Sequence, residues 1–158
     1  MTLAVTDNQY LEKFIKSLRF YCAYQERTLM EVHEKLNSFK LSEKHIERII
    51  KQLVEEDYLN EERYAKNFVV SKLHQKKWGK RKIIHALHLK QIPEIYIEMG
   101  LNEIDDDEYI KVIRDLIKKK RKESKEPDNF KFQYKIYSYL ISKGFESDMV
   151  WRVINYNH

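Results

Sequence analysis

Several residues in this chain have the types that nucleotide, metal or thiol chemistry requires, but their spacing completes no catalytic site. Gly79-Lys80 is the only Gly-Lys pair, and it lacks the glycine five positions earlier that a phosphate-binding P-loop needs. His85 and His88 have nearly metal-ligand spacing on an expected helix, without a nearby acid or cysteine to complete the set. Cys22 falls on the apolar side of an expected helix, which favours a buried structural thiol over a nucleophile. We therefore expect a protein that is not an enzyme and uses no cofactor or metal.

A segment with charge of only one sign is the strongest candidate for function. Between Tyr64 and Pro93 there is no Asp or Glu, although the whole chain carries 30 Lys and Arg against 25 Asp and Glu, for a net charge of +5. Uninterrupted positive charge attracts phosphates, and an aromatic ring within it can stack on a base. The candidate nucleic-acid-binding residues are Lys72, Lys76, Lys77, Trp78, Lys80, Arg81 and Lys82.

Two interpretations of this segment remain open from the sequence. In the first, the segment binds a polyanion, because charge of one sign repels itself unless something compensates it. In the second, Trp78 belongs to the core and the lysines form a solvated face. A second basic run, 118–125, ends an expected helix, where a solvated terminus competes evenly with a binding surface. The acidic run 103–108 is expected to start a helix rather than to bind a partner. A cluster of tyrosines near the end is expected to pack between repeats, with a partner-binding patch as the alternative: Tyr134, Tyr137 and Tyr139.

Sequence-specific DNA reading is a rival function, since three-helix units occur in helix-turn-helix proteins. The third helix of such a unit should carry Arg, Asn or Gln toward base edges. The corresponding segment 42–56 mixes glutamates with its bases, and segment 93–101 holds two glutamates and no base. These helices would be repelled from a major groove, so the pattern favours nonspecific contact with the backbone of single- or double-stranded DNA.

Composition predicts a soluble, all-helical protein. Gly 3 and Pro 2 leave little material for tight turns and hairpins, and a hydrophobic fraction of 42% suffices for a core. No run approaches 18 apolar residues, and Met1 to Tyr10 lacks the layout of a signal peptide. A lone cysteine fits a reducing compartment. We expect a cytoplasmic protein without a membrane partner.

Capping residues predict where helices begin. Capping boxes are expected at Thr28 with Glu31 and at Asp105 with Glu108. Pro93 suits the first turn of another helix. Further N-caps are expected at Ser42 and Asn60. The expected helices include about 8–25, 42–56, 130–142 and 147–156, and their total is nine in three sets of three.

One apolar pattern occurs three times. Its anchors are Leu36, Leu87 and Leu140, separated by 87 − 36 = 51 and 140 − 87 = 53 residues. Apolar residues recur four before and five, ten and fourteen after each anchor, as in a short helix, a tight connection and a second helix. The predicted fold class is all-α, an elongated array of three tandem three-helix repeats with domains at 9–59, 60–104 and 105–158.

Four segments resemble the RecX family of recombination regulators. Residues 28–36 resemble the family pattern S-x-x-E-L-x-x-K-L, and residues 57–65 resemble G-[LY]-[LI]-[ND]-[DE]-x-[RK]-[FY]-A. Residues 77–87 resemble K-x-G-x-x-K-I-x-x-x-L, and residues 135–145 are similar to the third repeat. Together the resemblance covers roughly Phe14 to Asn155. The sequence departs from the family pattern at some glycines. The glycine before the apolar plug is retained only as Gly144, with Lys40 and Gln91 in its place in the first two repeats, and Asp57 replaces a turn glycine.

The resemblance implies a cytoplasmic bacterial protein that binds the RecA recombinase. In that family the protein lies along the groove of the RecA–DNA filament, limits its growth or persistence and inhibits strand exchange, a role in homologous recombination and DNA repair. We expect a monomer of this kind, with the recombinase-binding surface unassigned. The alternative is a stand-alone, nonspecific nucleic-acid-binding helical module.

Overall fold

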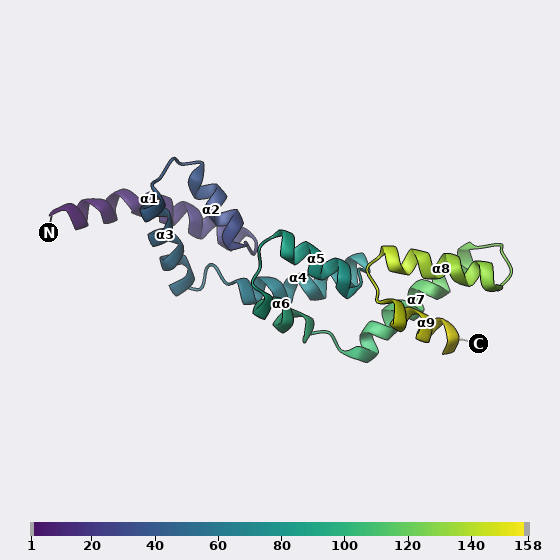
Figure 1. Cartoon of the computed structure of the whole chain (residues 1–158). Coiled ribbons are helices and arrows are strands. Elements are labelled where there is room, and N and C mark those ends of the chain that lie inside the picture. The colour runs from purple at the N-terminus through teal and green to yellow at the C-terminus, as the bar shows by residue number, and fades with distance from the viewer. Residues whose placement is uncertain (1, 157–158) are drawn as a thin grey trace. The chain divides into compact units, whose positions relative to one another are not determined.

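The chain is helical throughout its described length. The computed structural model describes the backbone of residues 2–156 and the side chains of residues 7–156, and those residues form nine helices and no strand (Figure 1). The all-α prediction is therefore confirmed. In chain order the helices are α1 (Thr2–Tyr24), α2 (Leu29–Asn37), α3 (Glu43–Glu55), α4 (Glu61–Lys76), α5 (Lys80–Leu89), α6 (Glu94–Leu101), α7 (Asp106–Glu123), α8 (Phe130–Ser142) and α9 (Ser147–Tyr156).

Three of the predicted caps are confirmed. The Thr28 hydroxyl accepts a hydrogen bond from the backbone N–H of Glu31, whose carboxylate accepts the N–H of Thr28 at 2.9 Å, which completes the capping box of α2. The Ser42 side chain accepts the N–H of His45 at the start of α3. The Asn60 side chain accepts the N–H of Arg63 at 2.9 Å and caps α4.

The predicted capping box of α7 is wrong. Asp105 is the N-cap residue, but its side chain makes no capping hydrogen bond. The Glu108 carboxylate instead lies 2.9 Å from the ring of His74 on α4, so a tertiary contact replaces the local one. The start of α1 also differs from the prediction, at Thr2 rather than near Asn8. Asn8 lies within the helix, and its side chain accepts a hydrogen bond from Arg48 of α3.

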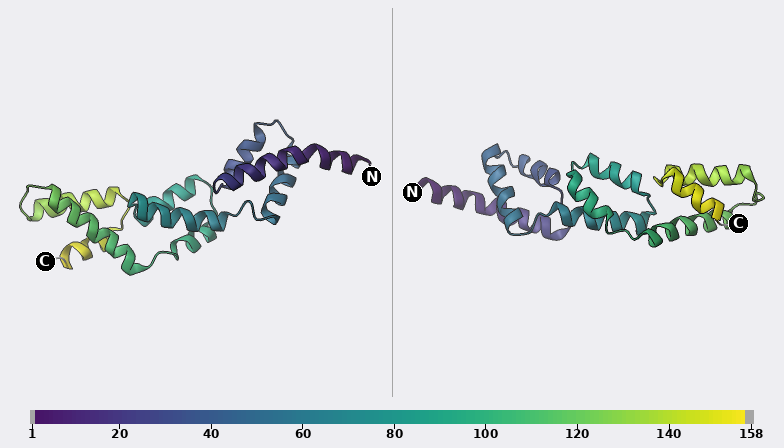
Figure 2. Two further views of the ribbon diagram at one scale, coloured as in Figure 1. Left: turned by 180° about the vertical axis from the view of Figure 1, so that it is seen from behind. Right: turned by 60° about the horizontal axis from the view of Figure 1, so that its bottom comes forward.

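The helices group into two compact units. Unit 1 consists of Met1–Tyr64 with Lys90–Ile92, and unit 2 of Ala65–Leu89 with Pro93–His158. In unit 1, α1 and α2 both pack on α3. In unit 2, α5 packs on α6, and α7, α8 and α9 pack on one another. Figure 2 shows these helices from two further directions. The predicted domain boundaries at 59/60 and 104/105 stay a prediction, and residues 157–158 of the third domain lie outside the described range.

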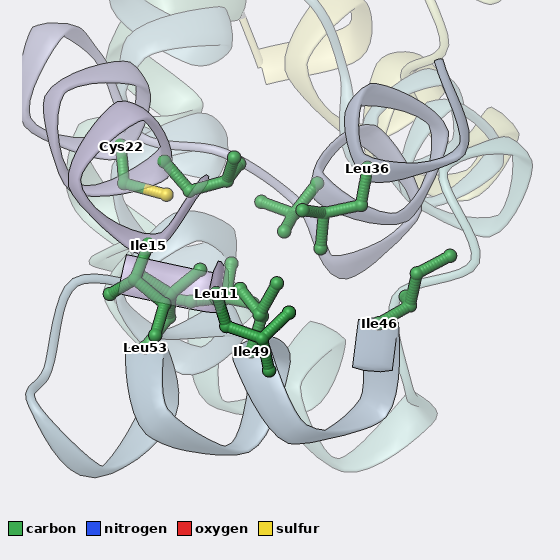
Figure 3. Packing of buried hydrophobic residues seen from close by; sticks show 10 residues of the cluster. Leu11, Ile15, Cys22, Leu36, Ile46, Ile49 and Leu53 are labelled. Atoms are coloured by element: carbon green, nitrogen blue, oxygen red, sulfur yellow. The ribbon is translucent and has the colours of Figure 1, made fainter. Parts of the chain in front are cut away.

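The core of unit 1 is built from the apolar faces of its three helices. Leu11 and Ile15 from α1, Leu36 from α2 and Ile49 from α3 point into one cluster (Figure 3). Cys22 borders this cluster and is buried, and burial raises the pKa of its thiol to about 11. The predicted burial of Cys22 is confirmed, and a thiol with so high a pKa is a poor nucleophile at neutral pH.

The repeat anchors occupy equivalent core positions. Leu36, Leu87 and Leu140 are each fully buried, as predicted. The other apolar residues of the pattern are buried too, except three that are half-buried: Leu41, Ile50 and Leu101. The recurring pattern therefore marks a recurring core. None of the helices in the described residues is long and apolar enough to cross a membrane.

Three tight connections hold a left-handed residue where the resemblance noted above implies glycine. Lys40, Asp57 and Gln91 adopt positive φ angles of 57°, 61° and 58°, and Gly144 adopts 95°. A side chain in this left-handed region costs about 1–2 kcal/mol relative to glycine. The connections therefore hold their shape against a local backbone preference.

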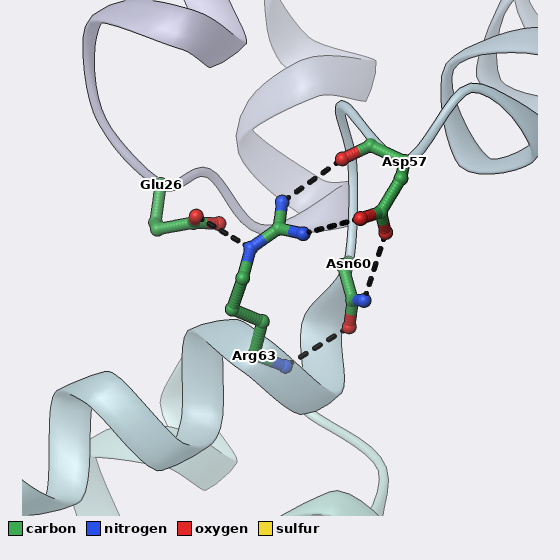
Figure 4. A network of polar contacts seen from close by, with 4 residues as sticks. All are labelled: Glu26, Asp57, Asn60 and Arg63. Carbon is green, nitrogen blue, oxygen red and sulfur yellow. Dashed lines mark hydrogen bonds and ion pairs between the residues drawn. The ribbon is translucent and has the colours of Figure 1, made fainter.

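A polar network secures the connection between α3 and α4. The Arg63 guanidinium donates to Glu26 at 2.6 Å and to both the carboxylate and the backbone carbonyl of Asp57 at 3.0 and 3.1 Å (Figure 4). Asn60 donates to the same Asp57 carboxylate, and these contacts lower the pKa of Asp57, with the bond from Asn60 the largest cause. The side chain of Asp57 thus offsets its strained backbone, which glycine could not do.

Candidate nucleic-acid interface

The candidate basic segment spans the end of α4 and the start of α5, and groups of the third repeat hold it in place. The N–H groups of Gly79 and Arg81 donate to the carbonyls of Lys143 and Gly144 at 2.8 and 3.0 Å. The N–H of Lys80 donates to the Tyr109 hydroxyl at 3.0 Å. The first N–H groups of a helix are the ones that lack partners within it. At α5 three consecutive N–H groups are engaged by protein, so this terminus is not an open anion site.

Two glycines allow this close approach. A Cβ atom on Gly79 would lie 2.3 Å from the backbone carbon of Gly144, and one on Gly144 would lie 2.4 Å from Cβ of Lys82. Neither position tolerates a side chain without displacing backbone, so both glycines are required for packing. Their separation of 144 − 79 = 65 residues explains why the sequence alone gave no sign of the contact.

Tyr109 of α7 is the buried polar centre of this junction. Its side chain is fully buried, its ring centroid lies 5.4 Å from that of Phe145, and its hydroxyl donates to the Glu146 carboxylate. Burial, together with the hydrogen bond to Glu146, raises the pKa of Tyr109. The hydroxyl therefore stays protonated, accepting from Lys80 and donating to Glu146 at once.

Aromatic rings lie beneath several of the candidate lysines. The ammonium groups of Lys72 and Lys82 lie 5.1 and 4.7 Å from the centroid of the Trp78 ring, which is half-buried. Lys80 lies 4.8 Å from the Tyr109 ring centroid. Cation–π contacts of this kind orient an ammonium group without neutralising it. The structure thus brings Lys72, Trp78 and Lys82 together, and turns Lys80 toward Tyr109.

Ion pairing divides the basic residues of the segment into two sets. Two lysines have a carboxylate within 4 Å, supplied by other parts of the chain: Lys66 with Glu103 and Lys90 with Glu31. The rings of His74 and His88 contact Glu108 and Glu94 in the same way. Within the part of the chain that the structure describes, none of the six candidate Lys and Arg side chains has such a partner; Lys76, Lys77 and Arg81 are exposed. The positive charge left uncompensated therefore coincides with the predicted site.

Lys143 belongs to the same surface, although sequence reasoning missed it. Its ammonium group donates to the carbonyl of Lys76 at 2.8 Å. Partial burial lowers its pKa, and repulsion from Lys82, Lys119 and Lys120 lowers it further. The junction therefore joins the central basic segment to the second basic run. No sequence signal pointed to Lys143, because it stands among apolar residues far along the chain.

The other candidate groups have structural partners. His88 hydrogen-bonds Glu94 at 2.7 Å, so an acid does lie near the histidine pair, contrary to expectation, yet no three potential ligands cluster within the described residues. Tyr137 and Tyr139 contact residues of the third repeat itself rather than of another repeat, which corrects that prediction, and Tyr134 is exposed. Tyr137 stacks on Trp151 at 4.6 Å, and its hydroxyl hydrogen-bonds Ser147.

Comparison with known proteins identifies the same architecture. Residues 60–101 match the family model of the second three-helix domain of RecX, and residues 106–154 match that of the third. The predicted tandem three-helix repeats are thus confirmed. The crystal structure of RecX from Lactobacillus salivarius is similar, with a TM-score of 0.86, 28% identity and coverage of 92% of this chain and 94% of that one.

Several curated proteins named regulatory protein RecX are similar to this chain in sequence. The regulatory protein RecX of Finegoldia magna is 33% identical over 92% of this chain and 72% of its own length, and that of Clostridioides difficile is 30% identical over 94% and 69%. A third, from Clostridium beijerinckii, is 32% identical over 81% of this chain, and the match spans 60% of that protein. With domain models, relatives and fold in agreement, this chain belongs to the RecX family of regulatory proteins.

Proposed function

We propose that this protein binds the RecA–DNA filament and inhibits recombinase activity, with a nonspecific contact to DNA. The relatives' name, regulatory protein RecX, supports a regulatory role rather than catalysis. In this proposal the protein acts as a cytoplasmic monomer and needs neither metal nor cofactor. The DNA-contacting residues are those of the uncompensated basic surface: Lys72, Lys76, Lys77, Trp78, Lys80, Arg81 and Lys82.

The observation that carries the DNA contact is the division of the basic residues by ion pairing. Within the segment that lacks acids, Lys66 and Lys90 are paired with glutamates, whereas the proposed residues lie against aromatic rings or extend into solvent. Clustered ammonium groups repel one another, and phosphates relieve that repulsion while releasing counterions. A polyanion is therefore the ligand that this surface favours.

Contact with the backbone, not with base edges, fits this surface. The N–H groups at the start of α5 are already engaged, so binding depends on flexible side chains. Long lysine side chains meet phosphates as point charges and carry no sequence information. Affinity should therefore be similar for unrelated sequences.

The test of regulation is RecA ATPase activity and strand exchange on single-stranded DNA, with and without this protein. Inhibition at amounts far below one molecule per nucleotide supports filament regulation. Inhibition only when the DNA is coated supports the alternative, a stand-alone nucleic-acid-binding module.

The test of the DNA contact is a matched pair of charge reversals. Lys76→Glu with Lys77→Glu changes two exposed cations of the site, and Lys44→Glu with Lys51→Glu changes two exposed cations of α3 by the same charge. We expect the first pair to weaken DNA binding and to flatten the log–log salt dependence by about 0.7–0.9 per lost phosphate contact. Equal slopes for both variants would refute this placement of the site.

A further inference from the structure

A second cationic and aromatic surface lies in unit 1, away from the central basic segment in sequence. A hollow of about 290 Å³ is lined by Ser17, Phe20, Tyr21, Tyr24, Arg27 and Lys35. We call it the α1 hollow. Its lining contains two cations, three aromatic rings and no acid. Its volume is near the lower end for small-ligand pockets, which suits one planar group.

Two of its rings are more exposed than packing requires. Phe20 is 76% exposed and Tyr24 is 77% exposed, and they lie one helical turn apart on the same face of α1. Neither ring contributes to the unit 1 core, which is formed by the opposite positions of the helix. Two large exposed rings side by side form an apolar patch, and such patches are typical of ligand- or partner-binding surfaces.

Both cationic side chains of the hollow lie close to its third ring, that of Tyr21. The Arg27 guanidinium lies 3.7 Å from the centroid of the Tyr21 ring, and its Nε donates to the Tyr21 carbonyl at 3.1 Å. Lys35 lies 5.6 Å from the same ring. The Nε bond fixes the guanidinium, and among the described residues its terminal nitrogens have no hydrogen-bond or ion-pair partner, so they can contact a ligand. Positive charge is thus held at the edge of the hollow by a ring that is itself half-buried.

We propose that the α1 hollow binds a nucleobase of single-stranded nucleic acid. Phe20 and Tyr24 supply stacking faces, and Arg27 contacts an adjacent phosphate. Every base has a face that can stack, so exposed rings beside cations bind single strands with little sequence preference. A duplex hides its base faces and would gain only the phosphate contact. This inference rests on the proposed DNA contact and adds to it a preference for single strands.

Another hollow of similar size, in unit 2, does not share this chemistry. It is lined partly by Glu123 and Glu126, and Glu126 is ion-paired with Lys135. Carboxylates at its edge would repel a phosphate backbone. Of these two hollows, the α1 hollow is the one whose charge complements nucleic acid.

The experiment compares two double variants of the whole chain. Phe20→Ala with Tyr24→Ala removes the stacking faces, and Phe130→Ala with Tyr156→Ala removes the same residue types at matched exposures of 77% and 79%. Binding of each to a fluorescein-labelled oligothymidylate and to a labelled duplex is measured by anisotropy. We expect the first variant to lose about 5- to 150-fold in affinity for the single strand, the range for one lost base stack, and to bind the duplex as before. The control should match the wild type on both.

Two further results separate this inference from the proposed function. An oligonucleotide carrying 5-bromodeoxyuridine should photocrosslink within residues 17–27, and a crosslink confined to Trp78 would overturn the inference while leaving the basic DNA site intact. If Lys76→Glu with Lys77→Glu binds both ligands normally, the basic site fails independently. Unchanged single-strand affinity in the Phe20 and Tyr24 variant, with recombinase inhibition lost, would assign the hollow to a protein partner and refute the nucleobase.

Discussion

Replacing Tyr109 by phenylalanine tests the junction that positions the start of α5. The substitution keeps the buried ring and its contact with Phe145, so it opens no cavity, and it removes only the hydroxyl. The N–H of Lys80 then loses its acceptor, and the Glu146 carboxylate loses a donor. We expect the free energy of unfolding to fall without a change of fold.

The magnitude follows from the two hydrogen bonds. A bond to a charged group contributes about 1.5–3 kcal/mol and a neutral one about 0.5–1.5 kcal/mol, for a sum of about 2–4.5 kcal/mol. Glu146 is half-buried, so water replaces part of its lost bond. We therefore expect a loss of about 2 kcal/mol, at the lower end of the range.

Urea unfolding followed by circular dichroism measures this loss, with hydrogen exchange to locate it. Tyr137→Phe is the matched control, because its hydroxyl bonds to Ser147 at 2.9 Å between two half-buried groups, and it should cost less than about 1 kcal/mol. In Tyr109→Phe the exchange of α5, α7 and α9 should accelerate most. A change below about 0.5 kcal/mol, or equal changes in both variants, would refute the assigned role of the hydroxyl.

Three other changes test other parts of the fold. Glycine at Lys40 or Gln91 should raise the unfolding free energy by about 0.5–1 kcal/mol in urea titrations, because relief of the left-handed backbone exceeds the added entropy of the unfolded chain; a loss would mean that the native side chain contributes a contact. Leu140→Ala should cost about 2–5 kcal/mol and accelerate hydrogen exchange in α8 and α9 before α1, whereas uniform acceleration would contradict separable repeats. The hydrogen bond from Arg19 lowers the pKa of Glu56 from 4.5 to about 2, so the stabilisation by this ion pair is complete above pH 4.5 and is lost as the pH falls toward 2. In thermal melts, Glu56→Gln should therefore lose less stability than the wild type over that pH range. An unchanged pH profile would exclude the ion pair as the source of the acid sensitivity.

Local signals in the sequence were enough to predict most of the helices. Thr28, Ser42 and Asn60 cap through bonds to residues three positions on, so spacing alone identifies them. The anchor leucines were predictable for a similar reason, since helical periodicity places them on a buried face. Asp105 was mispredicted because its expected partner Glu108 bonds instead to His74, a choice made by tertiary packing.

The candidate site was predictable in its charge but not in its geometry. Absence of acids over a long segment is visible in the sequence and singled out the lysines beside Trp78. Their pairing state was not visible, because the glutamates that neutralise Lys66 and Lys90 lie far along the chain. Lys143 joined the surface only through the contact between two distant glycines, which no local pattern encodes.

The contact between Gly79 and Gly144 also has a consequence for synthesis. At about 5–20 residues per second, the 65 residues that separate them take about 3–13 s to translate. For most of that interval a growing chain already carries every lysine of the basic segment, but the carbonyls that receive the N–H groups of Gly79 and Arg81 do not yet exist. A prematurely terminated chain that stops before Lys143 would remain in this state permanently. The basic segment therefore becomes ordered only after Lys143 and Gly144 have been made, which delays the proposed DNA-binding surface until the third repeat is synthesised.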